Sequence, residues 1–309
     1  MKINNFLLST FALALLMTAC NSKKQQPKDA EPPAKEVSYF GQTPPGITAE
    51  LFAPGTVSVN GRYEYGVSFS PNMDELYFSG NRDNGIQYVF ASKLEGNQWT
   101  PIKKANLTKG NKKNEFEAFV DPNGDKLFFA AYDSIFSDEK IWRIDRLKNG
   151  WGEAKVLDSP INDDIVFYPN TAANGDMYYT SISKWKMFYA PNKNGSYPEA
   201  HELDIAYGAH GFISPSQDFI LVDAQKDNDK TKDRDIHICF REKDGTWSQP
   251  INLGPSVNSD FTETCPSITP DGKYLFFSRY NEENGMSNIY WADATVIKTL
   301  KAAYFGSDR

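Results

Sequence analysis

Three glutamates occupy the same position before a repeated turn, and their repetition makes them the first candidates for chemistry in this sequence. They lie seven residues before the residue that opens the turn, as Glu64, Glu115 and Glu263. Two residues further on, the equivalent positions are Gly66, Glu117, Tyr168, His210 and Cys265. Carboxylates gathered in this way can bind a cation or a polar ligand, and a histidine among them can serve as ligand or base.

Two interpretations of the glutamates compete. In the functional one they bind a divalent cation such as calcium or a polar ligand, and Arg82 and Arg279 pair with an anionic group. In the structural one each glutamate accepts hydrogen bonds from backbone amides of the neighbouring repeat and acts as a latch. Repetition favours the latch, because asymmetric catalysis seldom needs the same residue several times.

His210 and Cys265 suggest a base and a nucleophile. Such a pair also needs an orienting group and an oxyanion site, and the sequence points to neither. The chain contains no Gly-x-Ser-x-Gly elbow, phosphate-binding loop, His-Glu-x-x-His pair or Cys-x-x-Cys pair. We therefore assign no catalytic residue, leave the question of enzymatic activity open, and expect no cofactor other than a divalent cation.

The elements that would position these residues follow from the turn itself. Thr269-Pro-Asp-Gly272 is a turn, and the apolar strand Tyr274–Phe277 follows it. Weaker copies of this hairpin occur at Val67–Phe78, Phe119–Phe129, Asn170–Tyr179 and Phe212–Leu221. A third and a fourth short strand follow most copies. Four antiparallel strands repeated radially are the blade of a β-propeller.

Both ends of the repeat array are incomplete, and each supplies what the other lacks. Thr48–Ala53 reads as a fourth strand without its first three, whereas the last repeat ends near Ala294 without a fourth strand. Pairing the two closes the ring and removes exposed sheet edges. The sequence thus predicts an all-β, five-bladed propeller of four-stranded antiparallel blades, closed by an N-terminal strand. Val296–Phe305 is expected to pack against this ring as a short helix or strand.

Composition agrees with a folded domain and excludes one class of partner. The chain has six Trp, 16 Tyr and 21 Phe among 309 residues, enough to fill the space between stacked sheets. Its formal net charge of -7 gives no basic surface for phosphates, so we expect no nucleic-acid partner. Cys239 and Cys265 are expected to be small buried hydrophobic residues rather than a disulfide.

The N-terminal segment indicates export. Residues 1–20 combine an early lysine with a short apolar run, and Met17-Thr-Ala-Cys20 resembles the lipobox of bacterial lipoproteins. Cys20 would then carry the lipid; the alternative is an ordinary secretory signal with a chance cysteine. Residues 21–45 are polar and Pro-rich and read as a flexible tether. The propeller domain is expected to span 46–309.

Several repeat motifs resemble the WD40-like repeats of TolB-type propellers. They are Ser70-Pro71, Ser214-Pro215, Thr269-Pro-Asp-Gly272, Tyr77-Phe-Ser-Gly-Asn-Arg82, Phe277-Ser-Arg279, Ile289-Tyr290 and Leu253-Gly-Pro-Ser-Val-Asn258. The resemblance spans about residues 47 to 294. It implies the propeller fold and is unspecific for activity, since such repeats occur in periplasmic scaffold proteins, in propellers of serine peptidases and in some carbohydrate lyases.

These features together predict a lipid-anchored propeller of the outer membrane, periplasmic or surface-exposed, that binds or scaffolds an envelope protein or a glycan. The alternative is a polysaccharide lyase or glycosidase. In both cases the site would lie at the mouth of the axial channel, where loops from separate blades meet. Its expected residues are Tyr63, Glu64, Arg82, Glu115, Tyr132, His210, Glu263 and Arg279.

Overall fold

Short apolar stretches separated by Pro-, Asp- and Gly-containing turns fold into antiparallel strands throughout the described chain. The computed structural model describes residues 39–81, 85–225, 233–281 and 285–306, all within the unit Val37–Arg309. The predicted signal peptide, most of the predicted tether, the lipidation candidate Cys20 and the site candidate Arg82 lie outside the described residues.

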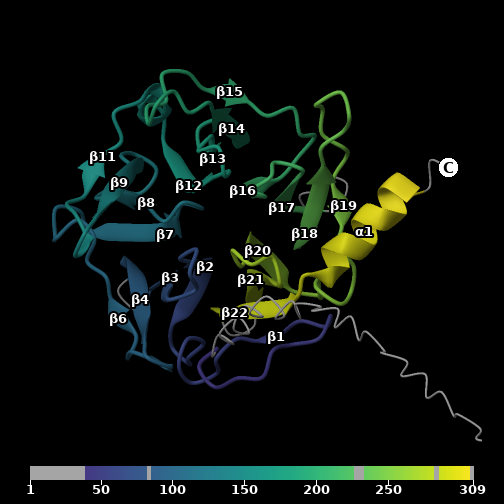
Figure 1. Cartoon of the computed structure of the whole chain (residues 1–309), viewed down its shortest axis with the longest axis horizontal. Helices are drawn as coiled ribbons and strands as arrows, with labels where there is room; N and C mark the ends of the chain where they lie inside the picture. The colour runs from purple at the N-terminus through teal and green to yellow at the C-terminus, as the bar shows by residue number, and fades with distance from the viewer. Residues whose placement is uncertain (1–38, 82–84, 226–232, 282–284, 307–309) are drawn as a thin grey trace, which may run out of the picture. The chain divides into compact units, whose positions relative to one another are not determined.

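Five small antiparallel sheets stand in a ring, which confirms the five-bladed propeller (Figure 1). Blade 1 comprises β2 (Tyr63–Phe69), β3 (Glu75–Asn81), β4 (Gln87–Glu95), β5 (Gln98–Trp99) and β6 (Lys103–Lys104). Blade 2 comprises β7 (Asn114–Val120), β8 (Lys126–Tyr132), β9 (Lys140–Leu147), β10 (Gly150–Trp151) and β11 (Lys155–Val156). Blade 3 comprises β12 (Val166–Thr171), β13 (Met177–Ser181), β14 (Lys186–Ala190) and β15 (His201–Glu202), preceded by the 3-10 helix η1 (Pro160–Asp163).

Blade 4 comprises β16 (Ala209–Ile213), β17 (Phe219–Gln225), β18 (Arg234–Phe240) and β19 (Ile251–Asn252). Blade 5 comprises β20 (Thr262–Ile268), β21 (Tyr274–Asn281), β22 (Met286–Asp293) and the N-terminal strand β1 (Glu50–Leu51). The first strand of each blade is innermost, and each inner strand contacts the next one around the ring: β2, β7, β12, β16 and β20. Loops that enter the inner strands therefore converge at one end of the axis.

Closure of the ring by the N-terminal strand is confirmed by its register. Leu51 pairs with Tyr290 in the antiparallel β1–β22 ladder, and the amide of Phe52 donates to the Ile289 carbonyl at 2.8 Å. The Phe52 side chain is fully buried and packs edge-on against Trp291, with ring centroids 5.1 Å apart. Burial of this aromatic side chain ties the beginning of the propeller to its last blade.

Residues just before β1 also pack against the sheets. Tyr39 is buried against Trp291, and Phe40 stacks on Trp99 with ring centroids 5.0 Å apart. The segment predicted as a tether, residues 21–45, therefore includes residues that pack on the propeller. Burial of their aromatic rings is more favourable than leaving the rings exposed to water.

The C-terminal segment forms a helix, α1 (Thr295–Gly306). Tyr304 and Phe305 pack on Phe240 of blade 4, and Lys301 forms an ion pair with Asp218. The sequence allowed a helix or a strand here. β1 already occupies the outer edge of β22, so the segment that follows β22 does not add the fourth strand of blade 5. In the described part of the chain, no helix is long and apolar enough to cross a membrane.

Candidate functional site

A cavity of about 470 Å³ opens at the end of the ring where the inner strands begin. We call it the mouth cavity. Aromatic side chains form much of its wall: Tyr63, Tyr65, Tyr132, Phe136, Phe167 and Trp185. Its polar lining includes Gln87, Glu117, Glu139, His210, Arg234 and Cys265. An aromatic wall with a few convergent polar groups is the usual character of a ligand site.

A β-bulge in every inner strand shapes the base of this cavity. The register of each inner strand shifts at the same repeat position. The first bulged residue has a positive φ in all five blades: Gly66 (59°), Glu117 (53°), Tyr168 (57°), His210 (44°) and Cys265 (52°). Only glycine adopts this conformation freely, and other residues there cost about 1–2 kcal/mol each. Strain retained at four equivalent positions is typical of functional sites.

Three of these residues form a compact group, which we call the bulge cluster: Glu117, His210 and Cys265. A carboxylate oxygen, a ring nitrogen and the thiol sulfur from the three side chains all lie within 4.8 Å of one another. His210 Nε2 is 3.7 Å from Glu117 Oε1, and His210 Nδ1 is 2.6 Å from Asp223 Oδ1. Three separate blades thus contribute one donor each, while β17 of blade 4 adds Asp223 behind the histidine.

Asp223 is fully buried and has a second partner. Arg234 Nη1 donates to Asp223 Oδ2 at 2.7 Å. Burial favours the neutral acid, but the charges of His210 and Arg234 outweigh it and lower the pKa of Asp223. Burial alone would lower the pKa of His210, yet the adjacent Asp223 raises it well above its ordinary value. A pre-oriented imidazole therefore presents Nε2 to the cluster.

The pKa values of the two acidic members of the cluster, Glu117 and Cys265, are raised, whereas that of Asp223 is lowered. Burial raises the pKa of Glu117 to about 7, although His210 and the Tyr168 amide partly oppose it. Burial likewise raises the pKa of the Cys265 thiol, against the opposing effect of His210. The site thus places a carboxyl group that titrates near neutral pH next to an imidazole and a thiol.

Next to the cluster, Tyr168 spans the axial channel, and we call it the channel floor. Its hydroxyl crosses from blade 3 to blade 5 and donates to the Pro266 carbonyl at 2.8 Å. Its ring packs edge-on against His210, with centroids 5.1 Å apart. Tyr168 also lines a small pocket of about 20 Å³, together with Ala118 and Pro169. Tyr168 thus lies between His210 of the mouth cavity and this small pocket.

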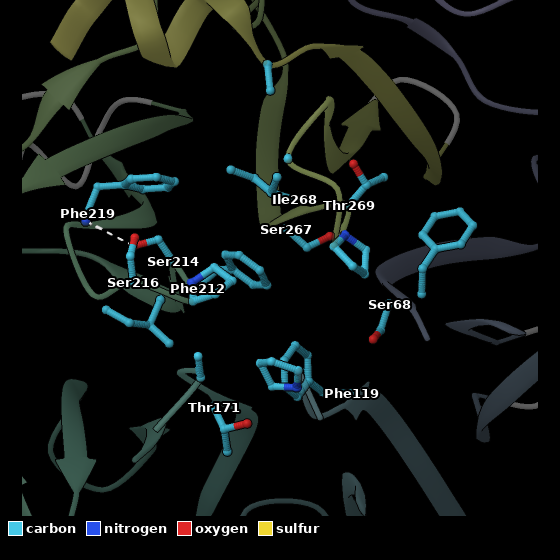
Figure 2. Close-up of a pocket in the computed structure, with 18 of the residues that line it drawn as sticks. Ser68, Phe119, Thr171, Phe212, Ser214, Ser216, Phe219, Ser267, Ile268 and Thr269 are labelled. Atoms are coloured by element: carbon cyan, nitrogen blue, oxygen red, sulfur yellow. Dashed lines mark hydrogen bonds between the residues drawn. The ribbon is translucent and has the colours of Figure 1, made fainter. Parts of the chain in front are cut away.

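The opposite end holds a second cavity of about 500 Å³, bordered by the hairpin turns (Figure 2). Figure 2 shows side chains from all five blades around this space: Ser68, Phe119, Thr171, Phe212 and Ser267. Its serines already bridge neighbouring blades, since Ser68 Oγ accepts the Val120 amide at 3.1 Å and Ser267 Oγ donates to the Val67 carbonyl at 2.7 Å. This apolar cavity offers less chemistry than the mouth cavity.

The three repeated glutamates are hydrogen-bonded to the links that enter their strands. Glu115 accepts the Leu107 amide at 2.8 Å and both the amide and the hydroxyl of Thr108. Glu64 and Glu263 repeat this arrangement, accepting from the Val59 and Ser259 amides respectively. All three side chains are buried and accept backbone amides, as a latch would. These amides belong to the link that enters the same strand, four to eight residues upstream, and not to the neighbouring repeat as predicted.

An arginine completes two of the three latches. Arg62 Nε donates to Glu64 Oε1 at 2.8 Å, and Arg279 Nε donates to Glu263 Oε1 at 2.7 Å. Arg279 also donates to the Val257 carbonyl. Each arginine therefore joins the entering link to the inner strand.

The expected site residues consequently fall into two groups. Tyr63, Tyr132 and His210 line the mouth cavity. The other group, Glu64, Glu115, Glu263 and Arg279, forms the latches and is absent from the described lining of that cavity. Arg82 lies outside the described residues.

Sequence reasoning did not assign Asp223, Arg234 or Trp185 to the site. Asp223 interrupts the apolar run Phe219–Ala224, and a lone acid inside a buried strand was the available signal. It also supplies the orienting group that the sequence could not identify for His210. Trp185, with φ 49° and a 57% exposed side chain, lies at the rim and had no sequence signal beyond its type.

Comparison with known proteins agrees with the fold. Searches found no family model and no curated protein that matches the chain. Among solved structures, a family 117 glycoside hydrolase from Zobellia galactanivorans is similar, with TM-score 0.53, 12% identity and coverage of 79% of this chain and 89% of the other. At this identity the likeness shows the fold alone.

Two further structures show weaker likeness. TolB from Acinetobacter baumannii has TM-score 0.46 and 14% identity over 74% of this chain and 56% of its own. Oligogalacturonate lyase from Vibrio parahaemolyticus has TM-score 0.43 and 13% identity over 76% and 67%. A propeller fold does not by itself determine an activity.

Proposed function

We propose that this protein is an envelope binding module whose mouth cavity holds part of a glycan. The observation that carries this proposal is the composition of the cavity wall. Tyr63, Tyr65 and Tyr132 line it, and the exposed rings of Phe136 and Trp185 stand at its rim. Flat apolar ring faces suit the C–H faces of sugars, while the Gln87 amide can bond to hydroxyl groups.

Binding is favoured over glycoside hydrolysis because most carboxylates near the cavity already accept hydrogen bonds from the protein. A glycosidase needs two carboxyl groups that can reach the substrate. The described cavity lining contains Glu117 and Glu139, and both Glu139 oxygens accept backbone amides, from Phe136 and Ser137. Of these two, Glu117 alone has a carboxylate oxygen without such a bond in the described residues. The latched glutamates cannot supply the second group without breaking their own contacts.

The same proposal includes attachment to the outer membrane through a lipid on Cys20. It is supported by the lipobox-like Met17-Thr-Ala-Cys20 and by the polar segment that follows it. Cells grown with a labelled fatty acid should incorporate the label into the wild-type protein and not into Cys20→Ala. Equal labelling of both proteins would contradict the anchor without affecting the glycan proposal.

A binding experiment on the full chain tests the glycan proposal. Neutral and acidic polysaccharides, with and without divalent metal, would be titrated calorimetrically into the purified protein. Trp185→Ala and Tyr132→Ala should each weaken binding about tenfold or more, as expected for aromatic anchors. Trp247→Ala is a matched control, because Trp247 is absent from the described cavity lining and packs on Arg241.

Three results would count against the proposal. Failure of every polysaccharide to bind would contradict a glycan ligand, and capture of an envelope protein that the cavity variants no longer bind would favour a protein scaffold. Release of shorter or unsaturated sugars would establish the enzyme alternative, a glycosidase or lyase respectively.

A further inference from the structure

The bulge cluster combines three chemically different donors at the base of the mouth cavity. Glu117 offers a carboxylate, His210 an imidazole and Cys265 a thiol, and within the described residues this is the one group of three or more such side chains close enough to share an ion. Thiolate and imidazole ligands select zinc and neighbouring transition metals, whereas calcium takes oxygen ligands. The cluster therefore differs in kind from the calcium site that an acidic ring would form.

The spacing of the donors suits a small ion. With the usual zinc–ligand bond lengths, a tetrahedral ion separates its ligand atoms by about 3.3–3.6 Å. His210 Nε2 and Glu117 Oε1 are 3.7 Å apart, and all donor atoms in the cluster lie within 4.8 Å of one another. Pairs separated by up to 4.8 Å would have to close by at most roughly 1.5 Å, which rotation of two side chains can share.

The histidine is already held in the orientation that a metal ligand requires. Metal-binding histidines usually donate their second ring nitrogen to a carboxylate, which fixes the ring and strengthens the ligand. Here His210 Nδ1 is 2.6 Å from Asp223 Oδ1, and Arg234 neutralises the other Asp223 oxygen from 2.7 Å. Asp223 is fully buried, so this support is part of the core of blade 4.

Glu117 has one oxygen whose hydrogen-bonding capacity is unused. Its Oε2 accepts the Tyr168 amide at 2.8 Å, while Oε1 receives no hydrogen bond from the described residues. The residue is only 5% exposed, and a buried carboxylate oxygen without a donor is costly. A metal ion would satisfy this oxygen. Together with a Cys265 thiolate, Glu117 would also neutralise a dication.

Backbone conformation adds independent support. Glu117, His210 and Cys265 all have positive φ at the equivalent bulge position, where the first blade has glycine and the third has Tyr168, which spans the channel. A purely structural bulge would favour glycine in every blade, because it has no Cβ to clash. Retention of three side chains with metal-binding donors at strained positions indicates that those donors have a use.

We propose that the bulge cluster binds one divalent transition-metal ion of the zinc type through Glu117, His210 and Cys265. The mouth cavity lies on the open side, so a fourth position remains for water or for a polar group of a bound molecule. This site goes beyond the glycan proposal and does not depend on it. Asp223 acts as a positioning residue for His210.

A competing use of the same atoms is a thiol nucleophile with His210 as base and Asp223 as orienting group. Glu117 disfavours it, since a carboxylate beside the sulfur opposes both a thiolate and a developing oxyanion. Metal binding uses the carboxylate as well, and therefore explains all three side chains.

Cobalt titration of the chelator-treated full chain tests the proposal directly. Co²⁺ bound by a thiolate produces an intense ligand-to-metal charge-transfer absorption, which oxygen and nitrogen ligands do not. We expect this band in the wild-type protein with one ion per chain, its loss on addition of excess Zn²⁺, and its absence in Cys265→Ser. Cys239→Ser is the matched control, because Cys239 is the other buried free cysteine and lies outside the cluster.

Two further variants test the assigned roles without removing a core side chain. Glu117→Gln keeps the shape of the ligand, and Asp223→Asn keeps the shape of its support; the latter should weaken Co²⁺ binding about 10–100-fold while retaining the band. Circular dichroism would verify that each variant is folded.

The proposal fails if the folded wild-type protein binds neither Co²⁺ nor Zn²⁺. It also fails if the band persists in Cys265→Ser or disappears in Cys239→Ser. Alkylation of Cys265 by iodoacetamide at the same rate with and without excess Zn²⁺ would likewise overturn it. None of these readouts involves a glycan, so failure here is distinguishable from failure of the glycan proposal.

Discussion

Replacement of Glu115 by alanine should destabilise the propeller strongly without altering its ligand site. Glu115 is 6% exposed and accepts three hydrogen bonds, from the Leu107 amide, the Thr108 amide and the Thr108 hydroxyl. Alanine would leave two backbone amides without an acceptor, at about 1–3 kcal/mol each. We expect a loss of about 4 kcal/mol in the free energy of unfolding.

Glutamine at this position should cost about half as much. Its amide keeps one acceptor oxygen, but its NH₂ group faces a backbone N–H, so one donor loses its partner. Glu115→Gln is therefore expected to lose about 2 kcal/mol. The two variants together distinguish hydrogen-bond acceptance from the mere filling of space.

Urea unfolding followed by circular dichroism measures both losses. Glu153→Ala is a suitable control, since the Glu153 side chain is 81% exposed and its ion pair is a surface contact with Lys109 at 3.3 Å; it should change stability by less than about 0.5 kcal/mol. A loss below about 1 kcal/mol in Glu115→Ala would refute the latch. So would a stable Glu115→Ala protein whose ligand affinity has fallen.

Three other predictions concern closure, the C-terminal helix and the channel floor. Phe52→Ala should lose about 3–5 kcal/mol in urea unfolding, because its fully buried ring joins β1 to blade 5; a loss near zero would mean that closure does not depend on this contact. Burial favours protonation of Asp218, but hydrogen bonds from Lys301 and two serines lower its pKa to about 2 from 3.8. Because the folded pKa is the lower one, its stabilisation is complete above about pH 4 and is lost as pH falls through about 2; Asp218→Asn should remove this pH dependence from the unfolding curve, and an unchanged pH profile would contradict it. Tyr168→Phe removes the donor to the Pro266 carbonyl and should cost about 1–2 kcal/mol while leaving the cobalt band intact; loss of the band would show that the hydroxyl takes part in metal binding.

The fold could be predicted because its signals are local and repeated. A Pro, Asp or Gly at the turn and β-formers on either side specify a hairpin within about ten residues, and five copies specify blades. Closure also followed, since the segment around Leu51 reads as a strand without a sheet, and Tyr290 lies in a sheet that lacks a fourth strand. An unpaired strand edge favours pairing with a free strand, even when that strand is distant in the sequence.

The candidate site was predicted only in part, because repeat position does not determine side-chain direction. Glu115 and Glu117 are two residues apart on one strand, yet the bulge between Phe116 and Phe119 directs them to different tasks. In a regular strand both would point to the same face. Nothing in the local sequence announces the bulge at a position held by glutamate rather than glycine.

The sequence by itself determined the repeating hairpins, their number and the strand that closes the ring, since each depends on short-range turn chemistry and on apolar pattern. Tertiary structure alone decided that Glu64, Glu115 and Glu263 hold backbone amides and that Glu117, His210 and Cys265 meet. The physical reason is distance along the chain. Glu117, His210 and Cys265 come from blades 2, 4 and 5 and approach one another only when the ring closes. Asp223 orients His210 because the fold places it beside this histidine, which lies 13 residues away in the sequence.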